Sequence, residues 1–289
     1  MDPRLQRRIQ RYGWDKAAGV YEQHWREQLA PAQRLLIRMA MLQRGERVLD
    51  VACGTGLVTF PAADAVGASG SVAAADLSDA MVAHIAAEAH RRNLRQVAPY
   101  RMDAESLEFP DASFDAVLCA LGLMYVPDPR AALREISRVL RPGGRAAIAV
   151  WGAREKCGWA EIFSIVDRRV QSEVCPMFFQ LGSADILRCV MEEAALIDVE
   201  AVRLSTTLRY SSPEEACSAA FAGGPVALAH SRFDAATRDE AYAEYLASIE
   251  PWRSHTGYHV PGEFVVAHGR RSLASQRSSR ETKEETQPC

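Results

Sequence analysis

The residues best suited to bind a charged small molecule follow directly on an apolar segment of the chain. ERVLDVA (46–52) predicts a short buried strand that carries Asp50, and Gly54 and Gly56 lie in the turn behind it, before a helix expected over 57–66. Glycine has no Cβ, so a ligand can approach the backbone closely there. The free N–H groups at the start of the next helix suit a carboxylate, whereas Asp50 suits an ammonium group. The turn therefore predicts a ligand that carries both charges.

The same turn argues against a dinucleotide site. Thr59 stands where the fingerprint G-x-G-x-x-G has its third glycine, and a pyrophosphate has to sit tightly on that helix. The carboxylate of Asp50 also fits poorly beside a bound pyrophosphate. A nicotinamide oxidoreductase is therefore a less favoured alternative.

Two further carboxylates lie at the ends of the next two expected strands. Asp76 falls twenty residues after Gly56, in the strand at 70–78, and Asp103 ends the strand at 97–105. Parallel strands bring such positions to one edge of the sheet, where ligands bind. There Asp76, an acceptor-only group, suits a pair of ribose hydroxyls, and Asp103 can reach an adenine amine. Each carboxylate alone is also explained as a strand-end cap, a helix cap or a turn former.

Strands and helices alternate through the first half of the chain. The expected elements are helices within 14–42 with Pro31 in the first turn of the second, strand 46–52, helix 57–66, strand 70–78, helix 78–93 with Ser78 as its N-cap, strand 97–105, a turn and strand at 110–123, helix 128–140, a stop at Arg141-Pro142-Gly143-Gly144, and strand 145–152. The strands are continuous apolar runs, as expected when both faces of a sheet are covered. This pattern predicts an α/β fold with a doubly wound parallel sheet.

The pattern changes after residue 152. Helices are expected within 153–197 and 212–250, with strands at 198–210 and 263–271. Residues 272–289 are polar and are expected to be disordered. We therefore predict one domain over 1–271, with a core of 12–152 and 198–271 and a helical cap within 153–197 and 212–262.

Three segments in this order resemble the core of class I S-adenosylmethionine (SAM)-dependent methyltransferases. They are VLDVACGTG, AADLSDAM and RMDAESLEFPDASFDAVLCALGLMYVPDPRAALREISRVLRPGG. Within that class the chain is similar to the ubiquinone- and menaquinone-biosynthesis methyltransferases and many secondary-metabolite enzymes, over roughly residues 12–152. The resemblance implies a Rossmann-like seven-stranded sheet, mostly parallel with an antiparallel last strand. Ala52 stands where the family usually has its first glycine.

The resemblance also implies roles for individual residues around SAM. The cofactor-binding set is Asp50, Ala52, Gly54 and Gly56 at the methionine part, Asp76 at the ribose, Leu77 and Met81 beside the adenine, Asp103 and Ala104 at its edge, Cys119 and Ala120 near the sulfonium, and Tyr21 closing over the cofactor. Packing of a helix face explains Tyr21 equally well.

Methyl transfer from a sulfonium is an in-line displacement that mainly requires the nucleophile to be held about 3 Å from the methyl group. A general base is needed only where the nucleophile must lose a proton. His24, His255 and Glu161 are candidates, and none is assigned. Apolar residues that could bind a hydrophobic or aromatic acceptor are Trp25, Trp159, Phe178, Phe179 and Trp252. Packing within the cap itself is the alternative explanation for them.

Charge and cysteine content exclude several other classes. The net charge is −3, which disfavours nucleic acid as a partner, and the basic stretch Arg4, Arg7, Arg8 and Arg11 is interpreted as a solvated helix face. The seven cysteines are widely spaced without C-x-x-C, so neither a disulfide framework nor a metal site is expected. Neither a secretory signal nor an apolar run of membrane-spanning length is recognised. We expect a cytoplasmic enzyme that can form a homodimer; a non-catalytic SAM-binding protein is the main alternative.

Overall fold

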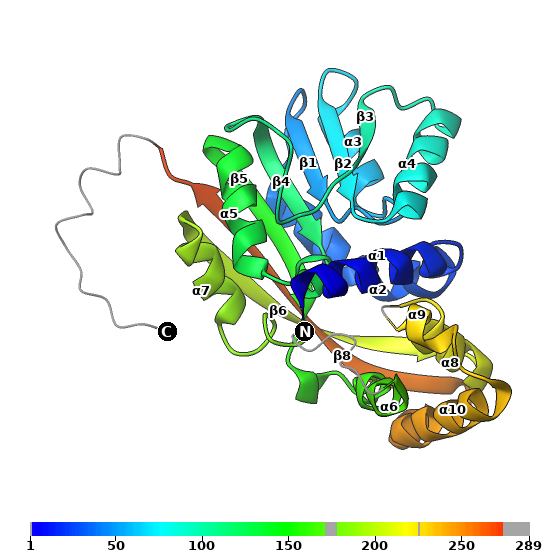
Figure 1. Ribbon diagram of the computed structural model, residues 1–289. Helices are drawn as coiled ribbons and strands as arrows, with labels where there is room; N and C mark the ends of the chain where they lie inside the picture. Colours follow the sequence, from blue (N-terminus) through cyan, green and yellow to red (C-terminus); the bar gives the residue numbers. More distant parts are fainter. Residues whose placement is uncertain (1, 171–177, 225, 274–289) are drawn as a thin grey trace.

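The strands of the protein form one mixed sheet (Figure 1). A computed structural model describes residues 2–170, 178–224 and 226–273. The strands are β1 Arg47–Val51, β2 Ser71–Asp76, β3 Val97–Arg101, β4 Phe114–Ala120, β5 Leu140–Trp151, β6 Leu196–Tyr210, β7 Arg253–Ser254 and β8 Gly257–Arg271. Their order is β3-β2-β1-β4-β5-β8-β6, and β8 runs antiparallel to both of its neighbours. The prediction of seven strands with an antiparallel last strand is confirmed; β7 is an additional two-residue strand on β8.

Helices lie on both faces of this sheet (Figure 1). They are α1 Pro3–Ala17, α2 Tyr21–Ala40, α3 Thr59–Val66, α4 Asp79–Arg91, α5 Pro129–Val139, α6 Glu161–Val170, α7 Ile186–Glu193, α8 Pro213–Phe221, α9 Ala227–His230 and α10 Ala235–Ile249, with single 3-10 turns η1 Leu123–Tyr125, η2 Arg154–Lys156 and η3 Glu250–Trp252. Side-chain caps fix several starting points. Ser78 accepts from the N–H of Met81 at the start of α4, which confirms its predicted role, and Asp128 accepts from Ala131 at the start of α5.

The N-terminal region differs from the sequence-based expectation in two ways. Helix α1 begins at Pro3 rather than after residue 13, and Pro31 lies inside α2 rather than in its first turn. An internal proline removes one helical hydrogen bond. Leu29, Ala32 and Leu36 are buried in the core, and this tertiary packing carries α2 through the proline.

The expected stop at 141–144 is a bulge within β5. Leu140 pairs with Phe114 of β4, but the next pair is Arg145 with Ala116. The four residues between them have no partner on β4, and Gly143 has a φ of +75°. A turn at these residues was predicted correctly, but they interrupt β5 and do not separate a helix from it, because β5 starts at Leu140 and continues from Arg145.

The last two long strands extend beyond the rest of the sheet. Pairing of β5 with β8 ends at Trp151 and Phe264, whereas β6 and β8 stay paired as far as Tyr210 and Tyr258. This two-stranded extension lies beyond the carboxyl end of β5, and α6, α8 and α10 gather there (Figure 1). Helix α7, which was expected in the cap, packs instead on β6 and β8 within the sheet. With α7 moved from the cap to the core, the division of the chain into core and cap stays a prediction.

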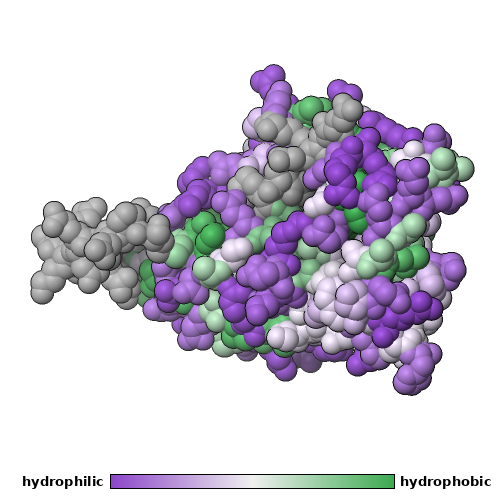
Figure 2. All heavy atoms as spheres, turned by 90° about the horizontal axis from the view of Figure 1, so that it is seen from below, coloured by the Kyte–Doolittle hydropathy of each residue, from purple (hydrophilic) through white to green (hydrophobic). Residues whose placement is uncertain are grey.

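Few large apolar side chains of the described residues are exposed. On the face in Figure 2, hydrophobic residues form separate small groups between hydrophilic ones. The exposed large apolar side chains are Leu5, Tyr12, Met41, Tyr100, Val202 and Leu273. None of the helices in the described part of the chain combines the length and apolar character needed to cross a bilayer.

Candidate functional site

A cavity opens at the carboxyl ends of β1, β2 and β4, and its empty space, including the open mouth, is about 790 Å³. Its walls are Arg7, Gln10, Trp14, Tyr21, Val51, Ala52, Gly54, Ala75, Asp76, Leu77, Met81, Met102, Asp103, Ala104, Leu107, Ala120, Leu121, Gly122, Tyr125, Val126 and Pro127. Nine of the predicted residues are therefore brought together here, although they come from widely separated parts of the chain. They are Tyr21, Ala52, Gly54, Asp76, Leu77, Met81, Asp103, Ala104 and Ala120. We call this space the strand-end cavity.

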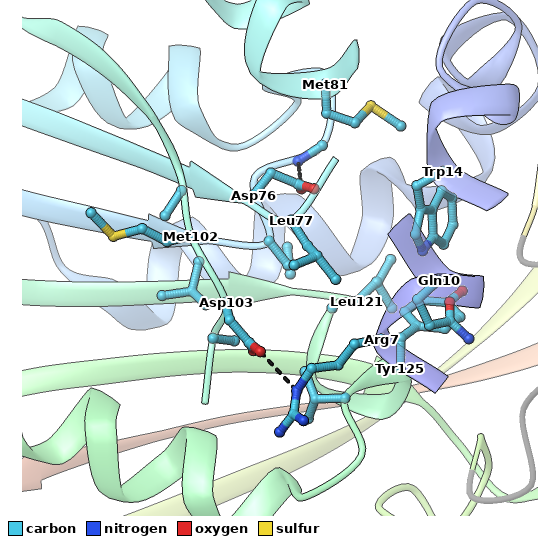
Figure 3. Close-up of a pocket in the computed structure, with 18 of the residues that line it drawn as sticks. Arg7, Gln10, Trp14, Asp76, Leu77, Met81, Met102, Asp103, Leu121 and Tyr125 are labelled. Carbon is cyan, nitrogen blue, oxygen red and sulfur yellow. Dashed lines mark hydrogen bonds and ion pairs between the residues drawn. The ribbon is translucent and has the colours of Figure 1, made fainter. Parts of the chain in front are cut away.

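Asp76 organises the turn at the centre of the strand-end cavity. Its two carboxylate oxygens accept hydrogen bonds from the backbone N–H groups of Gly54 and Ser78, each at 2.9 Å. The bond to Gly54 is drawn in Figure 3. Burial raises the pKa of Asp76, and the backbone donors partly offset this effect. The carboxylate thus links the ends of β1 and β2 while lying on the wall of the cavity.

Helix α1 closes the opposite side of the cavity, which the sequence analysis did not foresee. Figure 3 shows Arg7, Gln10 and Trp14 of α1 across from the strand ends. The Arg7 guanidinium lies 2.8 Å from a carboxylate oxygen of Asp103 and 2.8 Å from one of Glu105. The interpretation of the N-terminal arginines as a solvated face is therefore wrong for Arg7. The signal available in the sequence was charge complementarity: the N-terminal segment is basic, and a distant strand end carries the two acids Asp103 and Glu105.

Asp50, Gly56 and Cys119 belong to the predicted set but do not line the cavity. Asp50 is 1% exposed; one of its oxygens accepts from the Thr59 hydroxyl at 2.6 Å, and the other has no partner among the described residues. Burial, reinforced by the charge of Asp76, raises the pKa of Asp50 to about 7. Sequence spacing located the strand end but could not tell that this side chain turns into the protein.

The other two residues have packing roles. A Cβ at Gly56 would lie 2.4 Å from the ring of Phe60 and 2.6 Å from Ile85, so this glycine lets α3 and α4 approach the turn. Cys119 is buried within β4, and burial raises the pKa of its thiol to about 12. Its neighbour Ala120 is the residue that faces the cavity, because side chains alternate along a strand.

A second cavity adjoins the first, and its walls are almost entirely aromatic and aliphatic; its empty space, including the open mouth, is about 530 Å³. We call it the aromatic chamber; it is lined by Trp14, Tyr21, Trp25, Leu29, Leu121, Tyr125, Trp151, Trp159, Ile162, Phe163, Phe178, Tyr210, Ala220, Gly223, Gly224, Val226 and Tyr245. Four of these residues also line the strand-end cavity: Trp14, Tyr21, Leu121 and Tyr125. Trp14 contacts Tyr21 and Tyr125 edge to face, with ring centroids 5.7 and 5.0 Å apart. These shared residues form the neck between the two spaces.

Three of the five predicted acceptor-binding aromatics line the chamber, namely Trp25, Trp159 and Phe178. Phe179 and Trp252 do not. Phe179 packs behind the wall against Trp159 and Phe163. The Trp252 ring fills the space that a side chain at Gly158 would need, 2.6 Å from its Cβ position. Helical and strand patterns show that a residue is apolar but not which cavity it faces.

Comparison with known proteins agrees with this architecture. Residues 48–144 match the family model described as a methyltransferase domain. Over this segment the chain is similar to that family. The matched segment includes Asp50, Asp76 and Asp103, and it ends before the parts of the chain that supply most of the aromatic chamber.

Several named methyltransferases are similar to this chain over part of their length. Aklanonic acid methyltransferase DauC of Streptomyces sp. (strain C5) is 37% identical over 46% of this chain and 61% of its own. The 2-phytyl-1,4-naphtoquinone methyltransferase of Synechococcus elongatus is 39% identical over 40% of this chain and 50% of its own. The alignments thus span about half to three fifths of these relatives. Phosphoethanolamine N-methyltransferase 2 of Haemonchus contortus, solved with SAM, shares the fold with a TM-score of 0.59 and 19% identity, covering 90% of this chain and 57% of that one.

The candidate general bases that the sequence suggested lie outside both cavities. His24 is buried beside the Ser218 hydroxyl, 2.9 Å from Nε2, and burial lowers its pKa. His255 is exposed in the turn between β7 and β8. Glu161 pairs with Arg154 at the surface. In the described part of the chain, no cluster of three or more His, Cys, Asp or Glu side chains could hold a metal ion.

Proposed function

We propose that this chain is a SAM-dependent methyltransferase that acts on a small hydrophobic or aromatic molecule. The observation that carries this proposal is the junction of two cavities. One has carboxylates at its strand ends, the other is apolar, and they meet at a neck of four shared side chains. A methyl donor in the first space and an acceptor in the second would face each other across that neck.

Several features of the strand-end cavity fit SAM. Gly54 has a φ of +55° and no atom within 4 Å of its Cβ position, so a ligand can lie against this backbone. Asp76 retains lone pairs for ribose hydroxyls beside the two N–H bonds it accepts. Trp14, Leu77 and Met81 offer apolar surface for a purine.

When bound, SAM supplies a sulfonium-activated methyl group. The chain's own contribution is to position the two reactants and to exclude water. Trp14, Tyr21 and Tyr125 hold the neck narrow, and Trp25, Trp159 and Phe178 give the acceptor an apolar place to bind. The names of the relatives, which include a naphthoquinone methyltransferase, support an acceptor of this kind.

Calorimetric titration with S-adenosylhomocysteine tests the proposal. We expect binding by the wild-type protein and at least tenfold weaker binding by Asp76→Ala, because hydrogen bonds to a carboxylate contribute about 1.5–3 kcal/mol each. Asp64→Ala, an exposed position on α3, is the matched control and should bind normally. Urea unfolding of both variants separates lost affinity from lost folding. Equal affinity of folded Asp76→Ala and wild type would contradict the proposed site.

A further inference from the structure

We infer that the acceptor is a flat apolar molecule with an acidic oxygen, such as an enol, phenol or carboxylic acid, and that it enters the aromatic chamber already ionised. Its oxygens would accept hydrogen bonds from the indole N–H groups of Trp25 and Trp159 and the hydroxyl of Tyr245. This inference rests on the proposed function of the same site and specifies its substrate class.

The first support is a set of polar atoms in the chamber walls that have no partner. Trp25 Nε1, Trp159 Nε1 and Tyr245 Oη are buried without a hydrogen bond to any described residue. The three side chains are at most 7% exposed, and all of them line the chamber. Buried polar groups without partners are costly and are rare in folded proteins. A ligand that supplies acceptor atoms would satisfy them.

The glycine at position 223 keeps one of these donors accessible. A Cβ on Gly223 would lie 2.9 Å from Trp25 Nε1. Because Gly223 itself lines the chamber, the missing side chain leaves space beside the indole N–H. Indole N–H groups can only donate, so the complementary ligand atom is an acceptor.

The second support is the absence of a proton acceptor. Among the described residues that line the chamber there is no Asp, Glu, His, Lys, Arg or Cys. The ionisable groups there are the phenols of Tyr21, Tyr125, Tyr210 and Tyr245. Burial raises the pKa of Tyr21, Tyr210 and Tyr245. These three phenols stay protonated near neutral pH and act as donors, not as bases.

These two observations select the charge state of the acceptor. An un-ionised O–H nucleophile would have to lose its proton during the transfer, and the described chamber wall has no group to take it. With an oxygen anion the balance closes: an oxygen lone pair forms the new C–O bond, the methyl–sulfur bond breaks, and its electron pair stays on sulfur. The positive sulfonium becomes a neutral thioether and the negative acceptor becomes a neutral methyl ether or ester, so no proton has to move.

Two naphthalene derivatives test this chemistry in the complex with S-adenosylhomocysteine. 2-Hydroxy-1,4-naphthoquinone is an acidic enol whose anion absorbs visible light, and 1-naphthylamine has a similar frame without an acidic oxygen. We expect the hydroxynaphthoquinone to bind at least tenfold more tightly and to keep its anion spectrum when bound. Tighter binding of the amine, or loss of the anion spectrum on binding, would overturn the inference.

Conservative variants locate the donors. Trp25→Phe, Trp159→Phe and Tyr245→Phe should each lower affinity for the hydroxynaphthoquinone anion about tenfold and change affinity for naphthylamine less than twofold. Tyr245→Phe should also leave the urea midpoint unchanged or higher, because it removes an unsatisfied buried hydroxyl. Trp252→Phe, outside the chamber, is the control and should change neither affinity. Unchanged anion affinity in all three variants would contradict the assigned donors.

The inference and the proposed function can fail separately. Binding of S-adenosylhomocysteine without any preference for the anion would overturn only the substrate class. If S-adenosylhomocysteine itself does not bind, the proposed function fails first.

Discussion

The side chain of Ala52 occupies the space that Gly122 leaves empty. A Cβ built on Gly122 would lie 2.3 Å from the Cβ of Ala52. Ala52 follows β1, Gly122 follows β4, and both line the strand-end cavity. Ala52 also has a φ of +55°, a conformation that costs an L-residue about 1–2 kcal/mol. The alanine that replaces the family's usual glycine is therefore accommodated by a glycine from another strand end.

This relationship predicts a rescue between the two positions. Gly122→Ala should lower the free energy of unfolding by about 1–3 kcal/mol, because the two methyl groups overlap. In an Ala52→Gly background the same change should cost less than half as much. Urea unfolding of the four proteins in this cycle provides the measurement. Gly19→Ala, in open space, is the control, and strictly additive effects would show that the two residues are independent.

From the raised pKa of Asp50 we predict that the stability of the protein depends on pH. Burial raises its pKa to about 7, above the value of about 3.9 for an unfolded Asp. The folded state therefore keeps a proton that the unfolded chain loses, so stability falls as pH rises from about 4 to 7 and then levels off. The slope is at most ~1.4 kcal/mol per pH unit for this group.

Asp50→Asn should flatten that slope while preserving an acceptor for the Thr59 hydroxyl. Asp76, whose pKa is also raised by burial, would account for part of the slope that remains. Urea unfolding between pH 5 and 8 measures the difference. A variant with the same slope as the wild type would mean that Asp50 is ionised throughout this range.

From the ion pairs of Arg7 we predict that α1 controls release of the cofactor. Its contacts with Asp103 and Glu105 hold α1 against the strand ends. Arg7→Ala should accelerate dissociation of S-adenosylhomocysteine about two- to fivefold, with a smaller difference at high salt, because the pair is partly exposed. Stopped-flow fluorescence can follow the release. Arg8→Ala, exposed on the same helix, should leave the rate unchanged; equal rates in both variants would exclude this role for Arg7.

Asp15 attaches α1 to the start of α4. Its carboxylate accepts from the Ser78 hydroxyl at 2.6 Å and from the N–H of Ala80 at 3.1 Å, at the start of α4. Asp15→Ala should weaken docking of α1 by about 1–2 kcal/mol and so speed tryptic cleavage at the arginines of that helix. Mass spectrometry of the fragments identifies the sites, and Asp64→Ala is the control. Unchanged cleavage would show that other contacts suffice.

The sequence was informative wherever the evidence was local and periodic. Apolar runs and turn residues placed β1 through β5 and the helices between them. The strand-end positions of Asp76 and Asp103 led to the edge of the sheet where the strand-end cavity lies. The helix start at Ser78 was also correct, because a cap depends on residues three positions apart. In contrast, Pro31 was misplaced because long-range packing outweighs a local preference.

The sequence by itself determined the order of the elements, the segment that resembles methyltransferases and the residues that meet at the strand ends. The tertiary structure decided which of those side chains face the cavity: Asp76 does, whereas Asp50 turns inward to Thr59. It also decided that Arg7 closes the site and that Trp25, Trp159 and Tyr245 share one chamber. These facts depend on contacts between residues up to about two hundred positions apart, and no local pattern in the chain encodes such distances.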